Sequence, residues 1–344
     1  MLGACSAQGV RKVTQDRFDY NAAIARSANE QMLLNLVRLR YSEVPVFLAL
    51  NSVLTQYVWS GGAAVAGTSG EAMGFPAWTV GGSADFRYIE RPTMTYTPLS
   101  GAEFAAQLIA PVNKDNVFSL VSSGWPPDQL LRMTLQRVNE VASRAPGIGA
   151  SDGGEKGARF ERMVDLVIAL ANHQAIEVQR NAGSAGQEAS WLVFADGRDA
   201  ATQTLVDEFK DLTGLERARS RFLITTRIVG RDPGEVTIRV RSVLEMMGFL
   251  SAGVDVPPDH IEQGRAPQAA PFTMQDGRGA PLHVQWHKNR PSDAFVAVPY
   301  AGLWFFVPNA DHNSKQAFGL LTYLYQMQAS QQQGTAPLIT VPTG

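Results

Sequence analysis

Two histidines, His283 and His287, have the spacing in this chain that comes nearest to a metal site. Residues four apart lie on one face of an α-helix and could there share an ion. The segment Leu282–Trp286 alternates apolar and polar residues, however, which is typical of a strand. In a strand the two histidines would lie about 13 Å apart, too far to bind one ion. We expect no metal site here, and no pattern in the chain predicts a cofactor.

His260 and His312 each follow an aspartate, Asp259 and Asp311, which raises the question of an acid–histidine pair. Asp311 stands where a last helix is expected to begin, and aspartate is a preferred residue at the start of a helix. We therefore expect it to be a helix cap and not the orienting acid of a catalytic triad. His260 follows two prolines in an expected loop. The chain has no G-x-S-x-G, H-E-x-x-H or Walker sequence. We therefore assign no catalytic residue.

One glycine cluster, Gly147-Ile148-Gly149 with Gly153, superficially resembles a dinucleotide-binding loop. It follows an expected helix where that loop needs a strand, and its third spacing is wrong. We interpret this segment as part of a linker.

Cys5 is the only cysteine of the chain, so no internal disulfide can form. A thiol at a chain end has no fixed base to lower its pKa, which disfavours a nucleophile. Leu2-Gly3-Ala4-Cys5 resembles the lipobox of bacterial lipoproteins, in which an apolar and two small residues precede a cysteine that becomes acylated. The resemblance implies that Cys5 carries acyl chains, which hold a protein stably in a lipid leaflet. Ser6 follows where an aspartate would retain an enteric lipoprotein, which implies the outer membrane.

The segment before Cys5 is short for an export signal, which needs a basic start and an apolar stretch of about 7–15 residues. Only four residues precede Cys5. If the resemblance holds, we expect the coding sequence to extend upstream of Met1.

Aromatic residues gather near the end of the chain, and the tripeptide Trp304-Phe305-Phe306 places them on both faces of one expected strand. One face belongs to the core, and the other must be covered by a helix or by a partner. Both alternatives stay open. The residues that would form a partner surface are Trp286, Tyr300, Trp304 and Phe306.

Composition sets the broad class of protein. The chain has 344 residues, of which 45% are hydrophobic and 18% charged, with a net charge of -2. This composition argues against overall disorder and provides no global field that would attract nucleic acid. No run of about 18 apolar residues predicts a membrane-spanning helix.

The first half of the chain predicts a helix, then strands, then helices. Apolar residues recur at helical spacing over 20–41, with Asp19 as a possible cap. Arg26, Arg38 and Arg40 form a basic face, which we expect to be solvated or else to form ion pairs with a partner or with anionic lipid. Alternation over 46–97 indicates strands, with the glycine-rich stretch 61–74 as a connection. Ser100 and Glu103 form a capping box. Helices are then expected over 102–110, 115–122 and 128–142.

The second half repeats a strand–strand–helix order. A helix is expected over 158–173, a second capped by Asp199, a third opened by the capping box Ser242–Glu245, and a last one over 313–328. Strands are expected at 175–180, 191–194, 221–229, 235–240, 282–286, 295–298 and 303–307, the pair 221–229 and 235–240 being joined as a hairpin. Short connections force antiparallel pairing, so we predict an α+β fold of antiparallel hairpins and meanders with helices on one face.

Five regions follow from these patterns. We expect a lipid anchor and tether (1–18), an N-terminal α+β region (19–143), a Gly/Pro-rich linker (144–157), a C-terminal α+β region (158–330) and a disordered tail (331–344).

A wider resemblance supports export. Asn35–Tyr41 followed by Pro45, then Ile89–Gly101, and then Trp304–Val307 are similar to segments of a group of Gram-negative predicted lipoproteins. The resemblance implies no activity.

The sequence favours a membrane-tethered lipoprotein of the bacterial cell envelope, anchored in the outer membrane and facing the periplasm, with a non-enzymatic role in binding a protein partner or in assembly. An envelope hydrolase that uses a histidine and a carboxylate of the C-terminal half is a second hypothesis. A cytoplasmic structural protein is the third.

Overall fold

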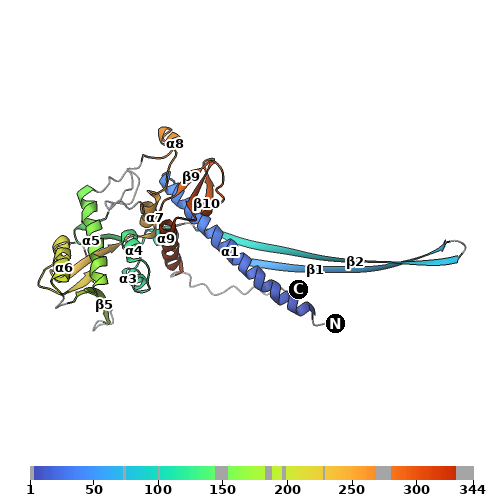
Figure 1. Ribbon diagram of the computed structural model, residues 1–344, viewed down its shortest axis with the longest axis horizontal. Helices are drawn as coiled ribbons and strands as arrows, with labels where there is room; N and C mark the ends of the chain where they lie inside the picture. The colour runs from blue at the N-terminus through green and yellow to red at the C-terminus, as the bar shows by residue number, and fades with distance from the viewer. Residues whose placement is uncertain are drawn as a thin grey trace. The chain divides into compact units, whose positions relative to one another are not determined.

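The computed structural model describes residues 4–72, 75–99, 101–143, 154–182, 188–195, 199–227, 229–268 and 280–330 (Figure 1). Helices and largely antiparallel sheets confirm the α+β class. The chain divides into two compact units, residues 46–101, called here the hairpin, and residues 1–45 with 102–344, called here the body. This division differs from the expected one, because residues on both sides of the predicted linker 144–157 belong to the body. Most of that linker and the whole tail 331–344 lie outside the described residues.

The hairpin consists of two long antiparallel strands, β1 (Phe47–Ala72) and β2 (Phe75–Leu99) (Figure 1). Its register shifts once, between Leu50 and Ser52. The glycines expected in a connection over 61–74 are instead part of β1 as far as the structure describes them, so that expectation is wrong. Each glycine of β1 has a cross-strand partner in β2. This continuous pairing keeps the segment in a strand although glycine has a low strand propensity.

The body begins with α1 (Ala4–Arg40), which starts well before the expected residue 20, so Asp19 is not its cap. Its C-terminal part is buried through Met32, Leu33 and Leu36, and packs against β10 and α7. Arg40 was expected on a solvated face. It is only 3% exposed, and its guanidinium donates to the carbonyl oxygens of Val254 (3.2 Å) and Pro267 (2.8 Å). No described helix is long and apolar enough to cross a bilayer.

The larger of the two described sheets of the body has six strands, in the order β4-β3-β8-β7-β6-β5. Its strands are β3 (Leu135–Val138), β4 (Val141–Ala142), β5 (Ile176–Ala182), β6 (Glu188–Phe194), β7 (Arg221–Thr225) and β8 (Glu235–Val240).

Two expectations fail in this sheet. The helix predicted over 128–142 ends at Thr134, and residues 135–142 form β3 and β4 because they pair with β8 and with each other. The predicted hairpin of β7 and β8 is a parallel pair, with Leu223 opposite Glu235. β8 is buried along nearly its whole length and lies between β7 and β3. Its pairing with strands on both edges therefore has more effect than the turn sequence before it, which had predicted a hairpin.

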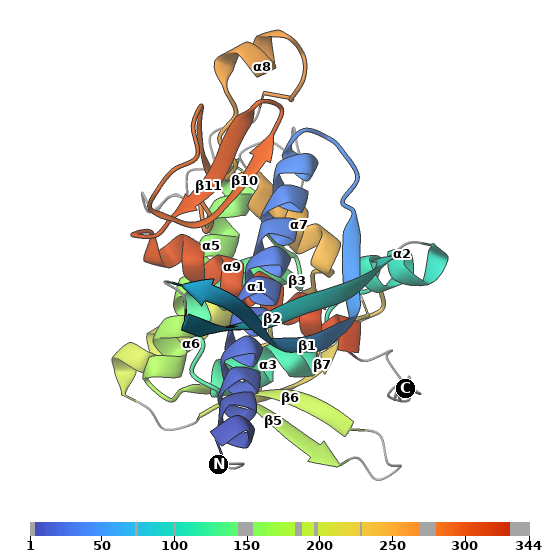
Figure 2. The same cartoon turned by 90° about the vertical axis from the view of Figure 1, so that its right-hand side faces the viewer.

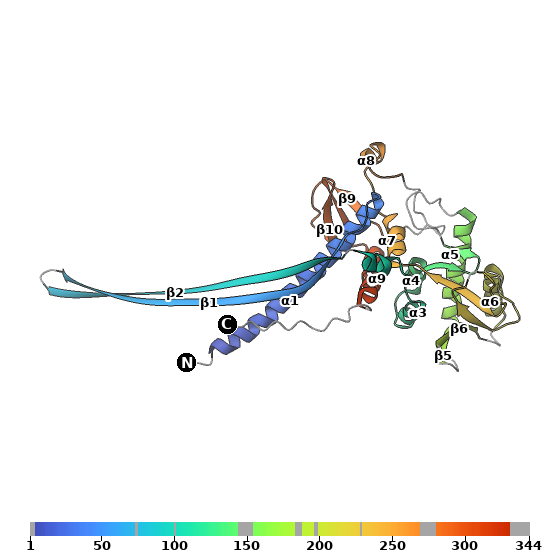
Figure 3. The ribbon, with the colours of Figure 1, turned by 180° about the vertical axis from the view of Figure 1, so that it is seen from behind.

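The helices that pack beside this sheet are α3 (Lys114–Ser122), α4 (Pro127–Thr134), α5 (Gly154–Asn172) and α6 (Ala200–Thr213). A further helix, α2 (Ala102–Ile109), packs against α7 (Val243–Ser251). Figure 3 shows α5 and α6 side by side next to β5 and β6. The predicted cap of α6 is confirmed, since Asp199 accepts from the backbone N–H of Thr202 at 3.0 Å. The expected capping box at Ser100 and Glu103 lies outside the residues described in atomic detail.

The remaining elements complete the body. They are α7 (Val243–Ser251), α8 (Pro258–Glu262), β9 (Gln285–His287), β10 (Ala294–Tyr300), β11 (Leu303–Pro308) and α9 (His312–Ser330). The capping box Ser242–Glu245 of α7 is confirmed. A small antiparallel sheet in the order β10-β11-β9 lies beside the C-terminal part of α1 (Figure 2). Asp311 caps α9 as predicted, accepting from the backbone N–H of Ser314 at 3.0 Å.

Candidate functional site

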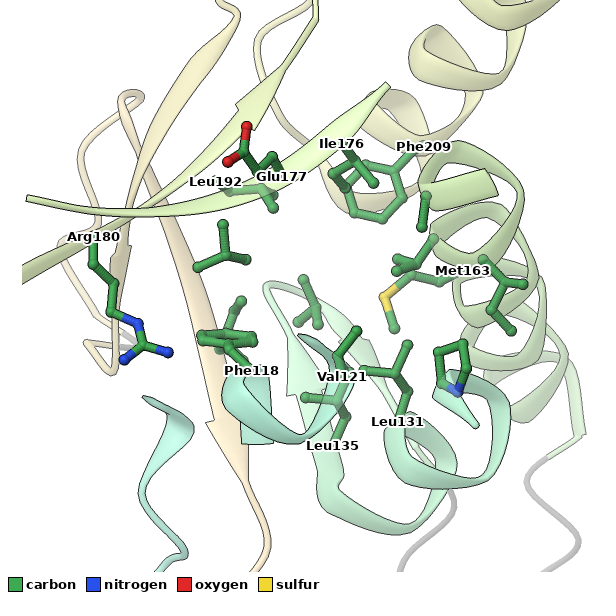
Figure 4. Close-up of a pocket in the computed structure, with 17 residues that line it drawn as sticks. Phe118, Val121, Leu131, Leu135, Met163, Ile176, Glu177, Arg180, Leu192 and Phe209 are labelled. Atoms are coloured by element: carbon green, nitrogen blue, oxygen red, sulfur yellow. The ribbon is translucent and has the colours of Figure 1, made fainter. Parts of the chain in front are cut away.

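An apolar cavity of about 320 Å³ opens in the body between α3, α4 and α5 on one side and the six-stranded sheet on the other (Figure 4). Its volume lies at the lower end of the range of small-ligand pockets. The residues that line it are Phe118, Val121, Pro127, Leu131, Leu135, Val138, Met163, Val167, Ile168, Ala171, Ile176, Glu177, Val178, Arg180, Leu192, Phe209 and Ile238. All but two of these are apolar.

Regular spacing brings these residues to one space. On α5, Met163, Val167 and Ala171 recur at steps of four and form one stripe along the helix. On β5, Ile176, Val178 and Arg180 alternate with their neighbours and therefore share one face. The sequence predicted the helix over 158–173. It could not predict the cavity, because a void depends on how closely helices and sheet approach.

The polar groups of the lining lie on β5. Figure 4 shows the carboxylate of Glu177 directed away from the cavity and Arg180 at its side. The guanidinium of Arg180 donates to the hydroxyl oxygen of Ser119 at 2.7 Å. Nearby on α3, Asp115 accepts from Ser190 at 3.0 Å and its carboxylate lies 3.5 Å from the Lys114 ammonium. The cavity thus offers an apolar interior, mainly aliphatic with two phenylalanines, and an exposed cation at one side.

The histidines considered as catalytic groups do not meet. His260 is buried and contacts the hydroxyl of Tyr41 and the guanidinium of Arg265. His283 lies 2.8 Å from the carboxylate of Asp255, on the surface.

The other two candidates are exposed. His287 hydrogen-bonds to the backbone of Asn289, and His312 begins α9. No group of three or more metal-ligating side chains occurs within the described part of the chain. Among the ion pairs of the described residues, His283 is the one of these four histidines that pairs with a carboxylate. The hydroxyl of Ser314 accepts from the His283 backbone and donates to Asp311, so its contacts are those of a helix cap.

The tyrosines around His260 form a polar and aromatic cluster. The rings of Tyr41 and Tyr300 lie 4.9 Å apart, and the hydroxyl of Tyr300 donates to Glu43 at 2.7 Å. Burial is the main cause that raises the pKa of Tyr300 above its ordinary value, and the Glu43 carboxylate raises it further. Through these contacts the cluster links the end of α1 to the segment around α8.

The four residues proposed as a partner surface lie on two different faces of the small sheet. Trp286 stands opposite Phe305 in the register, and the ring of Tyr300 contacts Phe305, so these residues share the face toward α1. Trp304 and Phe306 alternate with Phe305 and share the other face. Both are half-buried, and the guanidinium of Arg290 lies 5.2 Å from the Trp304 ring centroid. The four residues therefore form two pairs, Trp286 with Tyr300 on one face and Trp304 with Phe306 on the other.

Cys5 lies in the first turn of α1, and its side chain is outside what the structure describes, as are Leu2 and Gly3. A comparison of the chain with protein-family models, with curated proteins and with solved structures found no match in any of the three.

Proposed function

We propose that this chain is a lipid-anchored protein of the bacterial cell envelope with a non-enzymatic binding role, and that it binds an aliphatic ligand in the cavity beside α5. The observation that carries the binding role is the cavity itself, an apolar space of about 320 Å³ that opens to the surface. The acylated Cys5 would hold the body at the periplasmic side of the outer membrane. A protein partner would use the face of Trp304 and Phe306.

The lining supports an aliphatic ligand. Transfer of each methylene group from water into an apolar site is worth about 0.8 kcal/mol, so affinity should grow with chain length until the cavity is full. Arg180 at its side favours a ligand with a carboxylate at one end, because a guanidinium pairs well with a carboxylate. A medium-chain fatty acid combines both features and is the probe we choose.

Binding is tested by titrating the purified chain with dodecanoate and following displacement of a fluorescent fatty acid. We expect binding by the native chain, and about tenfold weaker binding by Ala171→Trp, since the indole would occupy the cavity beside α5. Asn172→Trp is the matched control, because Asn172 is an exposed neighbour that does not line the cavity. No binding by the native chain, or equal binding by both variants, would reject the cavity as the site.

The anchor is tested separately in the full-length gene. Cells fed an alkyne fatty acid should label the native protein and not a Cys5→Ala variant. Equal labelling of the two proteins, or a native protein found unlabelled in the cytoplasmic fraction, would reject the lipoprotein proposal.

A further inference from the structure

The hairpin is a sheet of only two strands, and this creates a physical problem. In the described chain no third strand pairs with β1 or β2. An isolated two-stranded sheet is marginal in water even when short, and these strands have 26 and 25 residues. Its own residues cannot cover its faces or satisfy its outer edges. Something else must do so.

The register sorts the residues of the hairpin into two unlike faces. Alternate cross-strand pairs share a face. One face carries the pairs Gly61–Phe86, Ala63–Ala84, Val65–Gly82 and Gly67–Val80. The other face carries Ser60–Arg87, Gly62–Asp85, Ala64–Ser83, Ala66–Gly81 and Thr68–Thr79. The first face, called here the apolar face, has no polar residue in this stretch, whereas the second has charged and hydroxyl residues.

Aromatic residues bound the apolar face at both ends. Trp59 stands opposite Tyr88 at one end, and Trp78 stands opposite Ser69 at the other. Trp59 and Ser69 are ten positions apart along β1, which corresponds to about 33 Å of strand, or about 23 Å along the bilayer normal when the strand is tilted by 45°. This length matches the apolar band of strands that cross a bilayer, and aromatic residues at both water interfaces are typical of them.

We propose that the segment 59–69 of β1, together with 78–88 of β2, enters a lipid bilayer with its apolar face against the lipid. Unpaired backbone N–H and C=O groups are too costly in hydrocarbon, so the outer edges must pair with other strands. The strands of matching length and pattern are those of further copies of this chain. The inserted form is therefore an assembly in which hairpins pair edge to edge and the polar faces lie away from lipid.

The experiment places an environment-sensitive fluorophore at four consecutive positions. Replacing the single native cysteine by Cys5→Ser removes the proposed anchor, so any response to membranes reports the hairpin alone. Into this background Ala63→Cys, Ala64→Cys, Val65→Cys and Ala66→Cys are introduced singly and labelled with a nitrobenzoxadiazole. Vesicles of phosphatidylethanolamine and phosphatidylglycerol are then added. We expect a blue shift and a gain in emission at 63 and 65 and little change at 64 and 66.

A second readout uses matched charges. Ala63→Lys and Ala64→Lys differ by one residue in position and place the same charge on opposite faces. A lysine against the middle of a bilayer is strongly unfavourable, so co-flotation with vesicles should weaken by at least about tenfold for Ala63→Lys and by far less for Ala64→Lys. Cross-linking on vesicles should give oligomers for the unsubstituted hairpin and mainly monomers for Ala63→Lys.

Three results would overturn the proposal. The first is no response to vesicles at any of the four positions. The second is an equal response at all four. The third is the alternating pattern before vesicles are added, which would mean that protein covers the apolar face. Because the background lacks Cys5 and the probes lie outside the cavity, failure here leaves the anchor and the cavity to their own tests.

Discussion

The hydroxyl oxygen of Tyr41 lies 2.6 Å from Nδ1 of His260, across 219 residues of sequence. The other ring nitrogen, Nε2, lies 3.0 Å from the guanidinium of Arg265. A guanidinium can only donate, so Nε2 accepts, and the proton of the neutral imidazole is on Nδ1, where it is donated to Tyr41. Neutral His260 thus links the end of α1 to α8 and the segment that follows it.

Protonation should break this link. Burial lowers the pKa of His260 below 6.5, the nearby Arg265 charge lowers it further, and Asp259 acts in the opposite direction. A histidine whose folded pKa is depressed contributes stability that is full above the unfolded pKa and is lost as pH falls toward the folded pKa. We expect the free energy of unfolding of the body to decrease as pH falls below about 6.5. Urea unfolding at pH 7.5 and 5.5 measures it.

The matched variant for this prediction is His260→Gln. It should lose about 1 kcal/mol at pH 7.5 through weaker hydrogen bonds to Tyr41 and Arg265. Its stability should also depend less steeply on pH between 7.5 and 5.5 than that of the native chain. If the free energy of unfolding changed equally with pH in the native chain and in His260→Gln, protonation of His260 would not be the cause of the change between pH 7.5 and 5.5.

Arg241 is fully buried, and its guanidinium donates to the carbonyl oxygens of Arg132 and Met133 and to the hydroxyl of Ser143. Burial lowers its pKa to about 10, so it stays charged at neutral pH. Arg241→Met should lower the free energy of unfolding by about 3 kcal/mol, because two buried carbonyl oxygens and the half-buried Ser143 hydroxyl lose their donor. Arg239→Met is the control: Arg239 is exposed on β8, and a change within about 0.5 kcal/mol is expected in denaturant unfolding. Comparable losses for both would contradict this role.

Two glycines of the body should respond oppositely to alanine. A Cβ at Gly253 would overlap the carbonyl oxygen of Leu282. The two segments are held close together here, because the carbonyl oxygen of Gly253 accepts a hydrogen bond from the backbone N–H of Val284 at 3.0 Å. Gly253→Ala should therefore lower the melting temperature strongly, with a cost above about 2 kcal/mol. Gly319 lies within α9 and has open space at its Cβ position. Gly319→Ala should stabilise the chain by about 0.5–1 kcal/mol, and a fall in melting temperature there would refute this reasoning.

Arg132 joins α4 to α5. It is 2% exposed and forms ion pairs with Asp128 (2.7 Å), Glu161 and Asp165 (2.9 Å). Arg132→Met should cost about 3 kcal/mol, since three carboxylates would be left close together around an apolar side chain. Arg162→Met, which removes an exposed pair with Glu208, should cost less than about 1 kcal/mol. Chemical denaturation measures the free energy of unfolding of both variants. A smaller loss of stability for Arg132→Met than for Arg162→Met would contradict the prediction.

Features that depend on a few neighbouring residues could be predicted from the amino-acid sequence. The α+β class, the helix caps at Asp199 and Asp311, the capping box at Ser242 and the bounds of β8 follow from local periodicity and from side chains that bond to nearby backbone. These interactions are short in range, so the same residues specify them in any context.

The other features depend on contacts between residues that are far apart in the sequence. Residues 135–138 form a strand because they pair with one edge of β8. β7 pairs with the other edge of β8 in parallel, so the predicted hairpin between β7 and β8 does not form. Arg40 was buried because carbonyl oxygens from residues 254 and 267 converge on it. The cavity, likewise, is a gap between elements that are distant in sequence. Such features follow from how distant parts of the chain pack, and packing is a property that no local pattern encodes.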